Sequence, residues 1–203
     1  SHNIKTQLLD LFGSSPKICT EENGSLVFGK KIDELNLKDL NNAKCFFVYA
    51  NQVANHLSVI EIIKYLKKKY PNIPISVLEN SQAVTAYSLS KIRKEFLDIG
   101  CNYIVLGDLE NPALQLYKNL EEKKPMSEVK GLISKDFSND RIDFVENLDV
   151  LNIPAWEDFP LENYWNLGYA HGPLSSKKYI PILSSRGCPY PCNFCVIPKT
   201  NER

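Results

Sequence analysis

The sequence of 203 residues lacks the features that mark several common classes of protein. No run of about 18 apolar residues occurs, which excludes an ordinary transmembrane helix. The 24 basic residues are balanced by 24 acidic ones, and this zero net charge gives no sign of a nucleic-acid or membrane surface. The opening Ser1-His2-Asn3 contains neither a starting Met nor a signal peptide, so we expect an artificial or cut end there.

Six cysteines are present, yet the sequence does not have the form of a disulfide-rich secreted protein. Such proteins are short and carry a signal peptide, whereas this chain is long and rich in Lys. We therefore expect a reduced, cytoplasmic protein. A hydrophobic content of 43% is enough to build a core, and the length suits one domain plus part of another.

The middle of the chain repeats a unit in which a short apolar run precedes a helical pattern. The apolar runs predict buried strands at residues 45–49, 75–78, 103–106 and 129–133, with starts roughly 30 residues apart. Each of the first three strands is followed by an amphipathic helix, whose apolar stripes are Val59, Ile63, Leu66 and Tyr70; Leu89, Ile92, Phe96 and Ile99; and Ala113, Leu116, Tyr117 and Leu120.

Residues with helix-start and helix-stop preferences predict the bounds of these helices. Ser58 and Glu61 have the spacing of a capping box at the start of the first helix. Gly100 closes the second helix, since glycine commonly ends helices. Asn111 as N-cap and Pro112 at the first helical position predict the start of the third.

This order of elements predicts an α/β fold, a Rossmann-like (flavodoxin-like) parallel sheet with helices on both faces. Ligands of such sheets bind outside the carboxyl ends of the strands. The polar loops after the four strands should therefore share one edge, and they are Asn51-Gln52-Val53, Glu79-Asn80-Ser81, Gly107-Asp108-Leu109-Glu110 and Ser134-Lys135-Asp136.

The flanking segments show weaker patterns. Residues 1–43 form either an extension or an abbreviated first half of the sheet, with a possible helix at 4–11 and a strand at 26–28. Residues 141–145 suit an edge strand, and 179–184 suit a new strand. Between them, 147–176 has prolines and little periodicity, so we expect a linker that packs by its aromatic side chains, Trp156, Phe159, Tyr164 and Trp165.

Three cysteines, Cys188, Cys192 and Cys195, stand in a C-x3-C-x2-C array near the end of the chain. Thiols so close together oxidise or bind metal unless something holds them, which disfavours plain packing. A structural zinc needs a fourth ligand, and its candidates are distant in sequence: Cys19, Cys45, Cys101 and His171. A four-iron cluster with three protein sulfurs leaves one iron open for a substrate or cofactor.

The array resembles the signature of radical S-adenosylmethionine enzymes, in which an aromatic residue, here Phe194, precedes the last cysteine. "SRGCPYPCNFCVIP" is similar to the form found where a radical domain follows a cobalamin-binding domain. "NLDVLNIPAWEDFPLENYW" at 147–165 resembles the linker between those domains. "CNYIVLGDLENPALQLYKNLEE" at 101–122 and the strand–helix–strand before it resemble the cobalamin domain.

The resemblance implies four parts, namely an N-terminal extension or partial sheet (1–43), a cobalamin-binding-like Rossmann domain (44–146), a linker (147–176) and the opening of a radical (β/α) barrel (177–203). It implies a [4Fe–4S] cluster on Cys188, Cys192 and Cys195, with S-adenosylmethionine on the open iron. It further implies cobalamin at the sheet edge, held by Asn51, Gln52, Val53, Asn80, Ser81, Gly107, Asp108 and Glu110. The intact enzyme would form a 5′-deoxyadenosyl radical, then methylate or rearrange an unactivated carbon. Its partners would be an unknown small-molecule substrate and an electron donor such as flavodoxin or ferredoxin, and this piece alone would be inactive.

Two departures from the family pattern keep alternatives open. Relatives commonly carry paired glycines where this chain has Glu79-Asn80, and side chains there would crowd a cobalamin tail. No Asp-x-His-x-x-Gly motif supplies an axial histidine, and His56 is either a cobalt ligand or a helix-start or surface residue. A degenerate, cobalamin-free module for substrate or partner recognition is one alternative. A methylthio-transferring relative is another, although it would need three further cluster cysteines.

Overall fold

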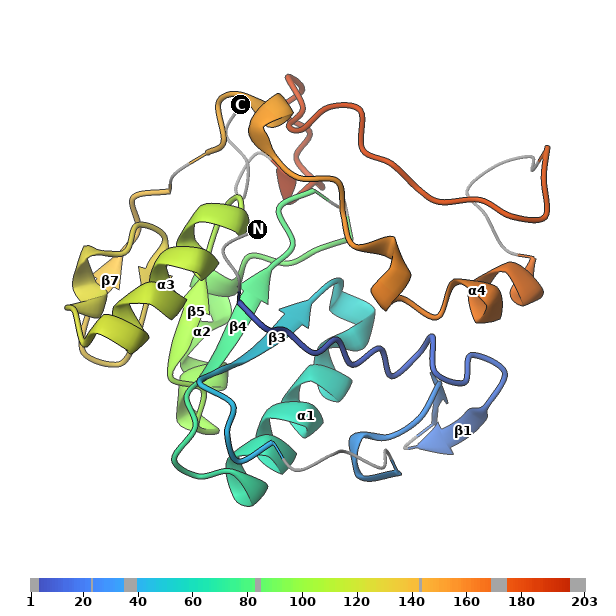
Figure 1. Cartoon of the computed structure of the whole chain (residues 1–203), viewed down its shortest axis with the longest axis horizontal. Helices are drawn as coiled ribbons and strands as arrows, with labels where there is room; N and C mark the ends of the chain where they lie inside the picture. The colour runs from blue at the N-terminus through green and yellow to red at the C-terminus, as the bar shows by residue number, and fades with distance from the viewer. Residues whose placement is uncertain are drawn as a thin grey trace. The chain divides into compact units, whose positions relative to one another are not determined.

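The computed structural model describes residues 4–22, 24–34, 40–82, 85–142, 144–168 and 175–197. The chain divides into two compact units, each made of two separate stretches of sequence. Residues 38–146 and 184–203 form what we call the sheet unit, and residues 1–37 and 147–183 form the hairpin unit. Figure 1 shows the elements of both units. The segment that carries the three clustered cysteines thus belongs to the same compact unit as the five-stranded sheet.

The sheet unit is built on five strands in the order β3-β4-β5-β6-β7. The strands β3 (Phe46–Ala50), β4 (Ile75–Glu79) and β5 (Tyr103–Val105) are parallel. Next to them, β6 (Leu132–Ile133) and β7 (Ser138–Asn139) each run antiparallel to the preceding strand. The prediction of an all-parallel sheet is therefore wrong for its last part. The fourth strand exists but is reversed, and the edge strand lies at 138–139 because the described part of 141–145 forms none.

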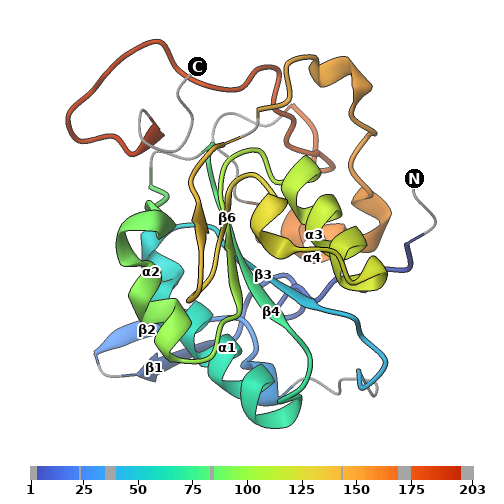
Figure 2. The same ribbon diagram turned by 90° about the vertical axis from the view of Figure 1, so that its left-hand side faces the viewer.

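Helices cover both faces of this mixed sheet, as predicted for a Rossmann-like α/β fold. The short turn η2 (Val53–Asn55) leads into α1 (His56–Lys69), which shares one face with α2 (Leu89–Asp98). On the other face lie α3 (Glu110–Glu122) and η3 (Met126–Glu128). Figure 2 shows α1 and α2 on one side of the strands and α3 on the opposite side.

Alternate side chains of the strands build the two cores. On β4, Ile75 and Val77 are fully buried beneath α1 and α2, while Leu78 packs toward α3. On β5, Ile104 joins the first core and Val105 joins the second. This alternation follows from the pleat of a strand, and it explains why the strands read as continuous apolar runs.

The predicted apolar stripes are confirmed, but two of the predicted helix starts are wrong. Ile63 and Leu116 are completely buried at the centres of their stripes. Helix α1 begins two residues before Ser58, so the predicted capping box lies inside the helix. Helix α3 begins at Glu110, so Asn111 is helical and not an N-cap. In each case a turn immediately before the helix lets the helix begin earlier than predicted. Neither helix has a hydrogen bond from a side chain at its N-cap.

The hairpin unit is small and contains an antiparallel pair, β1 (Cys19–Glu22) with β2 (Ser25–Phe28). This pair confirms the predicted strand near residue 27, and it is a sheet of its own, so it does not complete the five-stranded sheet. The rest of the unit contains η1 (Ile32–Glu34), η4 (Leu148–Val150), η5 (Trp156–Asp158) and α4 (Leu161–Leu167).

Helix α4 connects the two stretches of the hairpin unit. The Tyr164 hydroxyl donates to the Asp10 carboxylate at 2.6 Å, and its ring lies 5.7 Å from that of Phe12. The Asn163 amide donates to the Gly13 carbonyl at 2.7 Å. The indole of Trp165 donates to the Tyr179 carbonyl at 2.6 Å. The aromatic residues of the predicted linker thus do anchor it, with the start of the chain as one of their partners.

Two further predictions are wrong. Residues 4–11 form no helix, and residues 179–184 form no strand. A strand needs a neighbour to pair its backbone groups, and no described strand offers one to 179–184. Ile182 and Leu183 are accordingly 80% and 70% exposed. Within the described part of the chain, no helix has both the length and the apolar character needed to cross a membrane.

The second core makes a direct test of the sheet unit possible. Leu116→Ala should lower the free energy of unfolding by about 2–5 kcal/mol, because it leaves a cavity between α3 and the sheet. Leu57→Ala on α1, where the side chain is 67% exposed, is the control and should change it by less than about 0.5 kcal/mol. Urea titration followed by far-UV circular dichroism suits this measurement, because Trp156 and Trp165, the only two tryptophans, belong to the hairpin unit. Equal effects of the two variants would contradict the packing described here.

Candidate functional site at the carboxyl edge of the sheet

Three of the four predicted loops meet at the carboxyl ends of the parallel strands. The Asn80 amide after β4 donates to both the carbonyl and the side-chain oxygen of Asn51 after β3, at 2.9 and 2.8 Å. The Val53 amide donates to the Thr85 carbonyl at 3.0 Å, and the Thr85 hydroxyl lies 3.3 Å from the Gln52 side chain. These bonds join the first two loops into one polar edge.

The fourth loop, residues 134–136, lies at the opposite end of the sheet. Because β6 runs antiparallel to β5, its carboxyl end falls beside the amino end of β5. The Asp136 carboxylate accordingly contributes to raising the pKa of Tyr103, the first residue of β5, although burial of the phenol is the larger cause. The prediction that all four loops share an edge is thus wrong for this one.

Glu79 closes β4 with a buried carboxyl group, and its residue is only 2% exposed. Its Oε1 accepts a hydrogen bond from the Leu89 amide at 2.8 Å, so it serves an otherwise unpaired amide at the start of α2. Burial raises the pKa of Glu79 from 4.5 to about 7, against the opposing effect of hydrogen bonds from the Leu89 and Gly107 amides. The side chain therefore points into the protein, and the predicted crowding of the edge by Glu79 does not arise.

Asp108, in the loop after β5, is the most deeply buried charged group of the edge. Its side chain has no exposed surface. Oδ2 accepts from the Val145 amide at 2.9 Å, and Oδ1 lies 3.4 Å from Nη1 of Arg186 and 3.5 Å from the Gln82 amide. Gly107 precedes it with φ of +81°, a left-handed conformation in which glycine avoids the strain of a side chain.

Arg186 connects this loop to the cysteine-bearing segment. Its guanidinium makes a two-pronged contact with Glu110, with Nη1 at 3.0 Å from Oε2 and Nη2 bonded to Oε1. The Arg186 side chain is 16% exposed, and that of Glu110 is 39% exposed. The hydrogen bond to Glu110 is the main cause that raises the pKa of Arg186. Sequence reasoning missed Arg186, although its charge opposite to the two loop carboxylates was a usable signal.

The three predicted cluster cysteines lie on an irregular loop. Cys188 and Cys195 are half-buried and Cys192 is exposed, and all three are free thiols. The Cys195 amide donates to the Cys192 carbonyl at 3.1 Å, which places the last two cysteines on one turn. Phe194 between them is 89% exposed. Among the residues that the structure describes, no three His, Cys, Asp or Glu side chains converge as they would around a bound metal.

Among the described residues, Cys19, Cys45, Cys101 and His56 form no metal-binding group with the cysteines of this loop. Cys101 is buried and donates to the Tyr103 carbonyl at 2.9 Å, while Cys45 is half-buried and Cys19 is exposed. Burial raises the pKa of both Cys45 and Cys101 to about 11, which keeps them as thiols. His56 opens α1 and its Nε2 lies 3.0 Å from Glu95, as expected for a helix-start residue. His171 lies outside the described residues.

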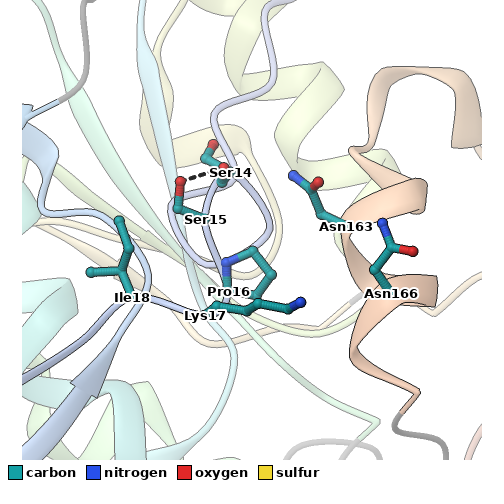
Figure 3. Close-up of a pocket in the computed structure, with 7 residues that line it drawn as sticks. All are labelled: Ser14, Ser15, Pro16, Lys17, Ile18, Asn163 and Asn166. Atoms are coloured by element: carbon teal, nitrogen blue, oxygen red, sulfur yellow. Dashed lines mark hydrogen bonds between the residues drawn. The ribbon is translucent and has the colours of Figure 1, made fainter.

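A surface hollow of about 340 Å³ lies within the hairpin unit. Figure 3 shows its mostly polar lining, Ser14, Ser15, Pro16, Lys17, Ile18, Asn163 and Asn166. A second hollow in the same unit lies around Trp156 and Trp165. No residue of the predicted cobalamin or cluster set lines either of them.

The residues present fit the two implied cofactors differently. The cysteine loop fits an iron–sulfur cluster by its chemistry, since it carries three free thiols, of which Cys192 is exposed and the other two are half-buried. The edge does not fit cobalamin as it stands. Asn80 is bonded to Asn51, the buried Ser81 hydroxyl accepts from Gln82, and Asp108 bonds to Val145 and Arg186. A bound nucleotide tail would have to break these internal bonds.

Two curated proteins that are similar to this chain carry the names of methylating enzymes. The chain is 29% identical over 154 residues, 74% of its length, to the hopanoid C-3 methylase of Methylococcus capsulatus, of which it covers 27%. It is 24% identical over 169 residues, 70% of its length, to an uncharacterized methyltransferase of Pyrococcus horikoshii, of which it covers 35%. The chain thus spans about a quarter to a third of the length of these curated relatives. No protein-family profile matches it, and no solved structure does either.

The buried Glu79 carboxyl makes stability depend on pH. Because its pKa is raised in the folded state, its contribution is complete below pH 4.5 and is lost as the pH rises through about 7. The loss amounts to about 3 kcal/mol of unfolding free energy if the whole shift acts on stability. Glu79→Gln keeps the acceptor for the Leu89 amide and should flatten this dependence between pH 4.5 and 7.

Urea unfolding at pH 5 and pH 8, followed by circular dichroism, checks this expectation. Glu61→Gln on the exposed face of α1 is the matched control and should retain the wild-type pH dependence. A Glu79→Gln protein with the same pH dependence as the wild type would show that this carboxyl does not titrate in the range expected.

Proposed function

We propose that this chain is the amino-terminal part of a methylating enzyme of the radical S-adenosylmethionine class. In this proposal Cys188, Cys192 and Cys195 ligate a [4Fe–4S] cluster. The observation that carries it is the set of three free thiols at C-x3-C-x2-C spacing on one loop. The similarity to one protein named a methylase and another named a methyltransferase supports the reaction class.

The chain's own residues account for several requirements of such a centre. Cys188, Cys192 and Cys195 would hold three irons of the cluster and would leave the fourth open to S-adenosylmethionine. The bound cluster and S-adenosylmethionine would supply the radical chemistry needed to act on an unactivated carbon. The half-buried positions of Cys188 and Cys195 limit the access of water and oxygen, whereas the exposed Cys192 and Phe194 face outward.

We further propose that the sheet unit acts as a scaffold that holds no cobalamin. The observation that favours this alternative is the internal bonding of the edge. The Asn80 amide is used by Asn51, and both oxygens of Asp108 have partners inside the chain. Polar groups that are already paired in a buried site gain little from a ligand and lose their existing bonds to it.

The cluster assignment is tested by anaerobic reconstitution of the full-length enzyme with iron and sulfide. About four irons per chain are expected, with formation of 5′-deoxyadenosine from S-adenosylmethionine under reduction. Cys192→Ala should lose most of the iron and this activity. Cys19→Ser, at an exposed cysteine of the hairpin unit, is the control and should keep both. Zinc in place of iron, or full iron retention in Cys192→Ala, contradicts the assignment.

The scaffold assignment is tested separately by titration of the same enzyme with hydroxocobalamin. We expect no shift in the cobalamin absorbance bands and no colour retained after gel filtration, because the side chains of Asn80, Ser81 and Asp108 are already bonded within the chain. An unrelated protein of similar size, carried through the same column, sets the background. Retention of one cobalamin per chain would refute the scaffold assignment and leave the cluster assignment intact.

A further inference from the structure

We propose that Asp108 and Glu110 form a clamp on Arg186 that holds the cysteine-bearing segment, residues 184–197, on the carboxyl edge of the sheet. We call these three residues the arginine clamp. Arg186 is then a positioning residue for the cysteines, and the carboxylates of Asp108, in the loop before α3, and Glu110, the first residue of α3, bind a segment of their own chain. The inference depends on the proposed function only for the identity of the group that the cysteines bind.

The geometry of the arginine clamp is specific. Both terminal nitrogens of Arg186 contact Glu110, and Nη1 also lies 3.4 Å from Asp108. A planar guanidinium that meets carboxylates with two nitrogens is fixed in orientation as well as in distance. The contact joins positions 76 residues apart, so it determines where the later segment lies.

Burial distinguishes this clamp from the ion pairs on the protein surface. The side chains of Lys124 and Glu122 form an ion pair in which they are 58% and 51% exposed, and such pairs contribute little. The corresponding values for Arg186 and Asp108 are 16% and 0%. Removing the Arg186 charge would take the guanidinium partner away from the buried Asp108 carboxylate, and breaking a buried ion pair in this way is costly.

The clamp lies directly beside the first cysteine. Only Gly187 separates Arg186 from Cys188, and a span of two residues reaches about 7 Å at most. Gly187 has φ of +84°, so the chain turns at that position from the clamp into the cysteine loop. Fixing Arg186 therefore restricts Cys188, which is half-buried, more strongly than it restricts the exposed Cys192.

The alkylation rates of individual cysteines in the full-length, iron-free protein test the clamp. Iodoacetamide labelling followed by peptide mass spectrometry gives the rate at Cys188, with the exposed Cys19 as internal reference and the buried Cys101 as a reporter of unfolding. Arg186→Gln should raise the Cys188 rate about tenfold, since it removes hydrogen bonds between charged groups. Arg186→Lys keeps the charge but not the two-pronged contact, so it should give an intermediate rate.

Two further variants separate the clamp from a general effect of charge. Glu110→Gln should raise the Cys188 rate in the same direction as Arg186→Gln. Arg93→Gln, which removes an exposed arginine of α2 that contacts Ser138, should leave the rate unchanged. A Cys188 rate in Arg186→Gln within about twofold of the wild type, with Cys101 still protected, would overturn the clamp.

Iron loading of the same variants separates this inference from the proposed function. If the wild type binds iron, Arg186→Gln should retain less of it after gel filtration than Arg93→Gln does. If the wild type binds no iron, the proposed function fails, while the alkylation rates still decide whether Arg186 positions Cys188. If iron binds equally to all variants and the alkylation rates agree, the clamp fails and the proposed function stands.

Discussion

The buried carboxylate of Asp108 is the constraint on which the arrangement of the sheet unit depends. An ionised group without exposed surface needs partners inside the protein, because water no longer solvates it. Asp108 obtains them from two distant parts of the chain, the Val145 amide that follows the last strand and the Arg186 guanidinium that precedes the cysteines. One side chain thus connects the end of the sheet, the loop after β5 and the cysteine segment.

This use of the sheet edge bears on the function we propose. In a Rossmann-like sheet the carboxyl ends of the strands are where a ligand is expected. Here Asn51, Asn80 and Asp108 are bonded within the chain, and the same edge carries the segment with three free thiols. In the function we propose, this mixed sheet would therefore contribute by holding the cysteine loop in place. Holding the cysteine loop in this way does not require the residues that would select a substrate.

The elements that could be predicted were those with a strong local pattern. The stripes centred on Ile63 and Leu116 identified two helices because a helix buries every third or fourth residue. The bounds were less accurate, since Ser58 and Asn111 have good capping side chains but the preceding turns begin the helices earlier. Residues 179–184 are apolar enough for a strand, yet a strand forms only where a neighbour pairs with it. Burial of Glu79 was missed because a carboxyl at a strand end looks like a loop residue in the sequence.

By itself the sequence determined the α/β class, the three parallel strands with their helices and the spacing of the three clustered cysteines. Each of these depends on residues close together in the chain. Only the tertiary structure decided the reversed direction of β6, the burial of Asp108 and its pairing with Arg186. Strand direction depends on how a connection crosses the sheet, and an ion pair between distant residues depends on which surfaces meet. Neither leaves a periodic or local trace in the sequence.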